Sequence, residues 1–115
     1  MISEKRLIEI ASSAKRMAER VVAKGAKKSA INNLSLVLAA HPSKSRANLV
    51  HLQEFLRHQV SRGERFTWAR ILLREMDRYF SGPYEEMEYL LGYLAWEVAY
   101  LEREATHVRE TGKQA

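Results

Sequence analysis

Residues that interrupt helices are sparse along this chain, and they divide it into segments of helical rather than strand length. The 115 residues include only five glycines and two prolines, the residue types that most strongly break regular structure. Apolar residues recur every three or four positions, as on one face of a helix, and the first such stripe runs from Leu7 and Ile8 to Val22. The sequence therefore predicts an all-α fold, a single-domain bundle of about five helices with short loops.

Capping and breaking residues set the ends of the predicted helices. Gly25 can end the first helix in a left-handed conformation, Pro42 ends the second, and Ser43 or Ser45 caps the third. The run Ser81-Gly82-Pro83 separates the fourth helix from the last. Helices are expected over about residues 3–24, 27–40, 43 or 45 to 62, 64–80 and 84–109, in a helical domain of residues 1–110 followed by a frayed polar end at 111–115.

Composition excludes several classes of protein. With 46% hydrophobic and 29% charged residues, the chain has the balance of a folded domain that buries one core. It contains no cysteine, so disulfides and Cys-ligated zinc are excluded, as suits a reducing compartment. No apolar run approaches the ~20 residues of a membrane span, and no signal segment opens the sequence. We therefore expect a cytoplasmic protein with no membrane contact.

Charge is distributed unevenly along the chain. Residues 1–80 hold 16 Lys or Arg against 7 Asp or Glu, whereas residues 81–115 hold 3 against 7, for a net charge of +5 overall. This asymmetry favours a body that binds a polyanion and an acidic end that contacts something basic, such as the body of a neighbouring copy. A basic surface that is only solvated is the alternative, and net charge alone does not separate the two.

Basic residues recur at helical spacing in two rows. Arg70, Arg74 and Arg78 lie four residues apart, which on one helix places their guanidiniums ~6 Å apart, similar to the spacing of phosphates along a nucleic-acid strand. A second row lies between residues 16 and 24. A guanidinium can bind phosphate oxygens through two parallel hydrogen bonds. The expected nucleic-acid contacts are Lys27, Lys28, Arg46, Arg57, Arg62, Arg65, Arg70, Arg74 and Arg78.

The last predicted helix carries an aromatic stripe beside its aliphatic one. Tyr89, Tyr93, Trp96 and Tyr100 are three or four residues apart. Tyrosine and tryptophan combine a large apolar area with a polar tip and are enriched at protein interfaces. We expect these four residues to belong either to the core or to an interface with another subunit. Nearby glutamates disfavour base stacking here, because they would repel phosphates.

No pattern for catalysis or metal binding is complete. His51, Glu54 and His58 share one helical face, and Glu104 with His107 gives a single E-x-x-H pair, whereas a di-iron bundle uses two such pairs. The chain has no nucleophilic cysteine, no G-x-S-x-G motif and no glycine-rich phosphate loop. We expect no enzymatic activity, no cofactor and no bound metal.

A helix-turn-helix DNA-binding regulator is the alternative interpretation. The second and third helices would be joined by residues 41–44, and the third would present Ser45, Arg46, Asn48 and His51 to phosphates and base edges. Against this interpretation, the turn begins with His41 and Pro42 and lacks the glycine frequent in that motif.

Three stretches, spread over most of the chain, are similar to motifs of one family of small helical proteins. Lys24-Gly25 followed by Ser29-Ala30-Ile31-Asn32-Asn33-Leu34 is similar to a lysine-glycine turn that runs into a Ser-Gln-Ile-Arg helix start. The segment from Leu56 to Arg62 takes the place of a Leu-Ala-Tyr-Ala-Ala-Gly-Arg type sequence. The stretch from Tyr89 to Tyr100, which ends in Val98-Ala99-Tyr100, is similar to a closing helix with a Val-Ala-Tyr ending. Together they resemble the small helical subunit of type III-A CRISPR effector complexes.

This resemblance implies a non-catalytic subunit of a ribonucleoprotein. Copies of it would stack on one another and on other subunits, and would contact the backbone of guide or target RNA while base pairing supplies specificity. Small subunits of related complexes that face DNA share the same design. Asn32, His58 and Leu101 depart from the family pattern, which has arginine, tyrosine and histidine there, so Arg62 is the residue that carries over best.

Overall fold

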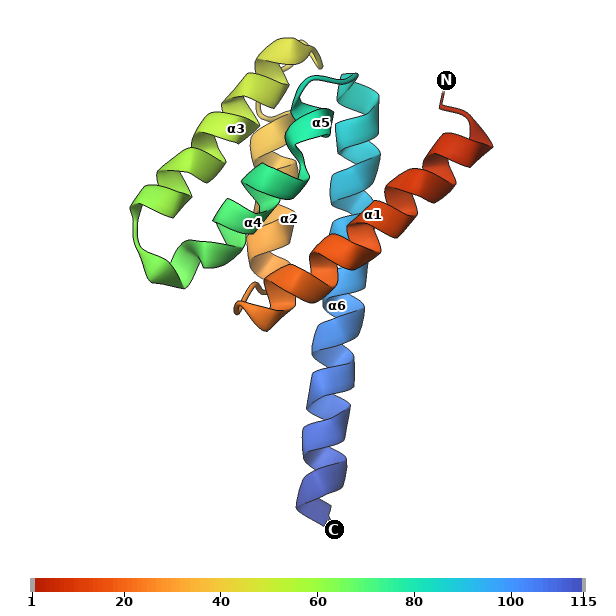
Figure 1. Cartoon of the computed structure of the whole chain (residues 1–115), viewed down its shortest axis with the longest axis vertical. Coiled ribbons are helices and arrows are strands. Elements are labelled where there is room, and N and C mark those ends of the chain that lie inside the picture. The colour runs from red at the N-terminus through yellow and green to blue at the C-terminus, as the bar shows by residue number, and fades with distance from the viewer. Residues whose placement is uncertain (1, 115) are drawn as a thin grey trace.

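Every regular element in the described part of the chain is helical, which confirms the all-α prediction. A computed structural model describes the backbone of residues 2–114 and the side chains of residues 2–107. Within that region, no helix is both long enough and apolar enough to span a bilayer. The elements in chain order (Figure 1) are α1 (Glu4–Ala23), α2 (Lys28–Ala39), α3 (Arg46–Ser61), the short 3-10 turn η1 (Glu64–Phe66), α4 (Thr67–Glu75), α5 (Asp77–Phe80) and α6 (Tyr84–Gln114).

Local capping interactions explain where α1 begins and ends. The Ser3 hydroxyl accepts a hydrogen bond from the backbone N–H of Arg6 at 3.1 Å, as an N-cap serine does. At the other end Gly25 has a φ of 88°, and the N–H of Ala26 donates to the carbonyl of Val21 at 2.9 Å. These are features of a Schellman C-cap, in which glycine adopts the left-handed conformation at no steric cost. The predicted end of this helix is confirmed.

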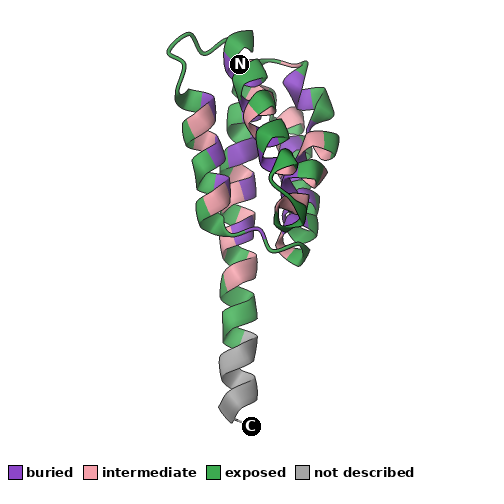
Figure 2. Cartoon of the chain, turned by 90° about the vertical axis from the view of Figure 1, so that its left-hand side faces the viewer, coloured by how far each residue is buried: buried purple, intermediate pink, exposed green. Residues whose placement is uncertain are grey.

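The core lies where the other helices pack against one half of α6. Figure 1 shows α1 crossing α6 and α2 running beside it, while α3 and α4 lie on the far side of α2. Figure 2 shows that buried residues concentrate in this upper region and that the lower half of α6 extends beyond it. The largest fully buried side chains are Ile10, Ile31, Leu34, Leu38, Leu49, Leu52, Leu56, Leu72, Met76, Met87, Leu90 and Leu91.

The expected apolar stripe of the first helix is wider than the face that packs. Ile10, Ala14 and Val21 are fully buried, but Ile8 is 62% exposed. Successive helical residues are about 100° apart, so a helix that presents one face to α6 must turn Ile8 towards solvent. Ile8 thus belongs to the predicted apolar stripe but not to the buried face of α1.

The fourth predicted helix, over residues 64–80, is divided into η1, α4 and α5. The backbone turns at Met76, which has φ −91° and ψ 7°. The turn changes the direction of the chain before α5, and Met76, Tyr79 and Phe80 are all buried. The last helix extends to Gln114 rather than 109. The fraying expected at 111–115 concerns residues whose side chains lie outside the described part.

Candidate nucleic-acid interface

The two basic rows expected on separate helices lie side by side, where α1 packs against α4 and α5. One hollow of about 250 Å³ is lined by Arg16 of α1 and Arg78 of α5. The next, of about 270 Å³, is lined by Arg20 of α1, by Lys24 directly after that helix and by Arg74 of α4. All five side chains are exposed. We call this set, Arg16, Arg20, Lys24, Arg74 and Arg78, the basic seam.

One carboxylate stands inside the basic seam. Glu75 lines both hollows, and it forms an ion pair with Arg20 across α1 and α4. Within the described part of the chain, the remaining four cations of the seam have no carboxylate within ion-pair distance. The seam therefore carries a net positive charge that the protein itself does not neutralise.

Arg6, close to one end of the seam, has a structural role instead. Its Nε and Nη2 donate to one oxygen of Glu86 on α6 at 2.9 and 2.6 Å, and its Nη1 donates to Glu9 at 3.1 Å. The hydrogen bonds to Glu86, followed by the one to Glu9, raise the pKa of Arg6 above its ordinary value. The guanidinium also lies 5.4 Å from the ring centroid of Tyr79. Arg6 thus joins the starts of α1 and α6 and is not available to a ligand.

The predicted row Arg70, Arg74 and Arg78 is not carried by a single helix. Arg70 and Arg74 lie one turn apart on the exposed face of α4, but Arg78 follows the turn at Met76. Regular ~6 Å spacing along one helix axis therefore does not extend to Arg78. This residue lines one hollow together with Arg16 of α1 instead, and this shared hollow brings the two rows together.

A second basic site forms where α3 meets η1 and α4. The guanidinium carbons of Arg62 and Arg65 lie 5.1 and 5.0 Å from the ring centroid of Phe66. Gly63, with a φ of 121°, makes the turn that brings the two arginines to one ring. We call Arg62, Arg65 and Phe66 the α3–α4 corner. Phe66 is not among the contacts predicted from the sequence; its signal there is its position four residues after Arg62 and one after Arg65.

The other expected contacts lie apart from these two sites. Arg57 forms an ion pair with Glu54 at 2.6 Å on α3. Arg46 begins α3, about 24 Å along the axis from its other end. Lys27 and Lys28 stand at the start of α2, where Lys28 lines a hollow on α6. The nine predicted residues are all exposed, but they do not form one surface.

The aromatic stripe of α6 is largely outside the core. Trp96 is 67% exposed, Tyr100 50% and Tyr89 42%, so the core alternative is wrong for these three. Tyr93 is half-buried, and its ring lies 6.5 Å from that of Tyr89 in a stacked arrangement. The surface beside Gly92 is open, since a Cβ added there would touch nothing within 4 Å.

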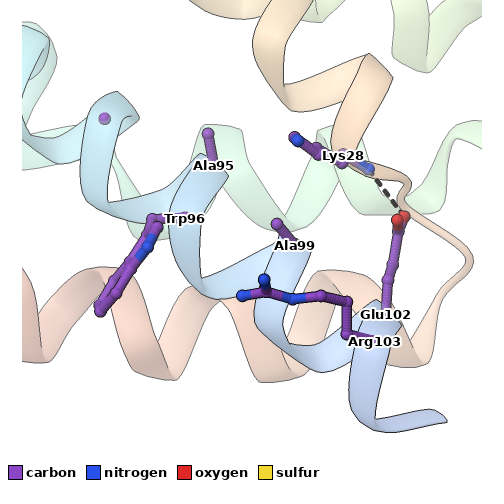
Figure 3. Close-up of a pocket in the computed structure, with 7 residues that line it drawn as sticks. Lys28, Ala95, Trp96, Ala99, Glu102 and Arg103 are labelled. Atoms are coloured by element: carbon purple, nitrogen blue, oxygen red, sulfur yellow. Dashed lines mark hydrogen bonds between the residues drawn. The ribbon is translucent and has the colours of Figure 1, made fainter. Parts of the chain in front are cut away.

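Two adjoining hollows lie along this face of α6. One, of about 650 Å³, is lined by the rings of Tyr89, Tyr93 and Trp96. The other, of about 430 Å³, is shown in Figure 3, with Trp96 at one end and Lys28 with Glu102 at the other. Glu102 also accepts a hydrogen bond from the backbone N–H of Lys28 at 2.7 Å, which caps the start of α2. We call this surface the α6 hollow.

Asn48, which the helix-turn-helix alternative presents to DNA, is fully buried. Its Nδ2 donates to the carbonyls of Leu38 at 2.7 Å and His41 at 2.6 Å. Its Oδ1 accepts from the N–H of Ser45 at 2.9 Å and from the hydroxyl of Ser43 at 3.0 Å. Every hydrogen-bonding group of the side chain is used to hold the turn between α2 and α3. Asn48 therefore cannot contact a base edge.

No metal centre is apparent in the described part of the chain, where no three His, Asp or Glu side chains converge. His51, Glu54 and His58 are all exposed, and Glu54 is paired with Arg57. Exposed side chains on one helix would leave most of the coordination sphere of a metal ion to water. They would therefore not impose the geometry that a specific metal site requires.

Comparisons with known proteins assign no family to this geometry. No protein-family model, no curated protein and no solved structure matches the chain. Function is therefore inferred from the chemistry of three surfaces: the basic seam, the α3–α4 corner and the α6 hollow.

Proposed function

We propose that this chain is a non-catalytic subunit that binds the backbone of RNA within a CRISPR ribonucleoprotein effector complex, where copies stack along the groove for guide and target. The observation that carries the proposal is the convergence of the two basic rows in the basic seam. Four of its five cations lack a carboxylate partner, so phosphates are the natural counter-charges.

The chemistry of the seam favours backbone binding over the reading of sequence. Arginine and lysine bind phosphates through charge and two-pronged hydrogen bonds. Base edges are read instead by side chains such as asparagine and glutamine placed in a groove, and the asparagine best placed for that role, Asn48, is buried. Specificity would then come from pairing between guide and target rather than from this chain.

The α6 hollow supports the stacking part of the proposal. Exposed tyrosine and tryptophan rings around a concave surface are typical of interface centres. Figure 1 shows α6 on the opposite side of the bundle from the α3–α4 corner. A subunit with an aromatic surface and a basic site on opposite sides can contact a neighbouring copy and a nucleic acid at once.

Charge reversal in the seam tests this proposal. We expect the double substitution Arg74→Glu with Arg78→Glu to weaken binding of a single-stranded RNA of mixed sequence about tenfold or more at physiological salt. The plot of log affinity against log salt should become shallower by about 1.4, at about 0.7 for each lost phosphate contact. Fluorescence anisotropy over a salt series measures both quantities. The loss should be the same for unrelated RNA sequences.

A matched control separates the seam from net charge. Lys15→Glu with Lys44→Glu makes the same change in charge at exposed positions that line neither hollow of the seam. Equal losses in the two double variants would refute a localised site. Unchanged binding in the seam variant would refute the proposed function. Tight binding to one duplex DNA sequence would favour the helix-turn-helix regulator.

A further inference from the structure

The α3–α4 corner combines features that the basic seam lacks. Two guanidiniums lie about 5 Å from one aromatic ring, and the ring of Phe66 is half-buried, so part of it stays open to solvent. In the described part of the chain, neither Arg62 nor Arg65 has a carboxylate partner. The corner thus holds two uncompensated positive charges against an accessible π surface.

The ring is held in position by the fold. Phe66 packs against the core on one side, with its centroid 6.3 Å from that of Trp68, a buried residue of α4. The turn before it is fixed by the N–H of Phe66, which donates to the Gly63 carbonyl at 3.0 Å, and by the hydroxyl of Thr67, which donates to the Glu64 carbonyl at 2.6 Å. A ligand that stacks on Phe66 would therefore meet a ring that is already ordered.

We propose that the α3–α4 corner binds one unpaired nucleotide, whose base stacks on Phe66 while Arg62 and Arg65 bind the flanking phosphates. This inference rests on the proposed function and adds a preference for unpaired over paired nucleotides. Aromatic rings and planar guanidiniums both stack on bases of any sequence. Because arginine side chains are long and flexible, a base can replace one guanidinium over the ring, and the freed arginine then reaches a phosphate.

The position of the corner fits a strand that continues to the seam. Arg65 and Arg74 are nine residues apart along η1 and α4, about 14 Å, and Arg70 lies between them on the exposed face of α4. A single strand could therefore pass from the stacking site along α4 to the seam. Bases in a duplex are stacked on their own neighbours, so a paired strand can use the phosphate contacts but not Phe66.

The test compares Phe66→Leu with Phe66→Trp. We expect Phe66→Leu to weaken binding of single-stranded RNA about tenfold, to change duplex RNA binding less than twofold, and to leave the salt slope unchanged, because no charge is lost. Phe66→Trp, which keeps an aromatic ring, should bind single-stranded RNA as the wild type does. An RNA that carries the fluorescent base 2-aminopurine should change its emission on binding to the wild type, because the base leaves its stacked neighbours for the ring, and this change should be absent with Phe66→Leu.

Two controls keep the result interpretable. Phe55→Leu removes another half-buried phenylalanine that packs on the core but is outside the corner, and it should leave RNA binding unchanged. Thermal unfolding of each variant shows whether the fold is retained. Equal loss of single-strand and duplex binding in a folded Phe66→Leu variant would overturn the stacking site. If the seam variant is impaired while Phe66→Leu is not, the stacking site fails and the proposed function stands; if neither is impaired, both fail.

Discussion

Replacing Asn48 with alanine removes the side chain that fastens the end of α2 to the start of α3. Its amide nitrogen donates to the carbonyls of Leu38 and His41 at 2.7 and 2.6 Å, and its oxygen accepts from Ser45 at 2.9 Å. The residue is fully buried, and no buried polar side-chain atom in the described part of the chain lacks a partner. The substitution leaves these backbone groups without partners, while water reaches the buried Leu38 carbonyl poorly.

The expected loss of stability follows from this geometry. Each of the three bonds to backbone groups contributes about 1 kcal/mol net, and a buried carbonyl left unpaired adds about 1 kcal/mol or more. Alanine is the better helix former by about 0.6 kcal/mol, which offsets part of the loss. The free energy of unfolding should therefore fall by about 3 kcal/mol, and a domain of this size should melt about 10 °C lower.

Thermal and urea unfolding followed by circular dichroism measure this loss, with Asn32→Ala as the control. Asn32 is exposed on α2, so its replacement should raise stability slightly through helix propensity. Asn48→Asp should be worse than Asn48→Ala at neutral pH, since a carboxylate would face two carbonyl oxygens. Burial raises the pKa of that new carboxyl. The loss in free energy of unfolding of Asn48→Asp relative to the wild type should therefore become smaller on acidification. A melting temperature for Asn48→Ala within about 1 °C of the wild type would refute the reasoning.

Two further substitutions probe the charged and aromatic surfaces. Glu75→Gln removes the carboxylate from the seam, so single-stranded RNA should bind about threefold more tightly with a steeper salt slope. Glu54→Gln, which breaks an exposed ion pair on α3, should leave RNA binding unchanged. Weaker RNA binding by Glu75→Gln would contradict the proposal that the seam binds RNA. Trp96→Ala should abolish concentration-dependent self-association in sedimentation velocity with little loss of stability, because the ring is 67% exposed. Ile8→Ala, at a comparably exposed apolar residue, is its control; unchanged association of Trp96→Ala would place the interface elsewhere.

Local features of the sequence predicted the fold, because helix ends and buried faces depend on neighbouring residues. Gly25 ends α1 as expected, and Ser45 caps α3. The division of residues 64–80 was missed because a straight helix satisfies the same apolar spacing. The turn at Met76, after which Tyr79 and Phe80 pack into the core, has no marker such as glycine or proline in the sequence around it.

The candidate site was predicted in composition but not in arrangement. Helical spacing identified Arg74 and Arg78, yet spacing within one helix says nothing about which other helix lies beside it. The pairing with Arg16 and Arg20 arises from the crossing of α1 over α4 and α5. Phe66 was missed for a related reason: its importance comes from two arginines that a turn folds onto it.

The seam also relates binding to the stability of the fold. Like charges repel one another, and in the described part of the chain the seam gathers five cations around the carboxylate of Glu75. The packing of α1 against α4 must overcome this repulsion in the unbound protein. Phosphates placed between the two helices remove the repulsion and add attraction. Relief of the repulsion between the seam cations therefore contributes to the free energy of RNA binding. Removing seam cations should therefore weaken RNA binding and raise the free energy of unfolding of the unbound protein. Loss of a structural contact would instead lower the free energy of unfolding.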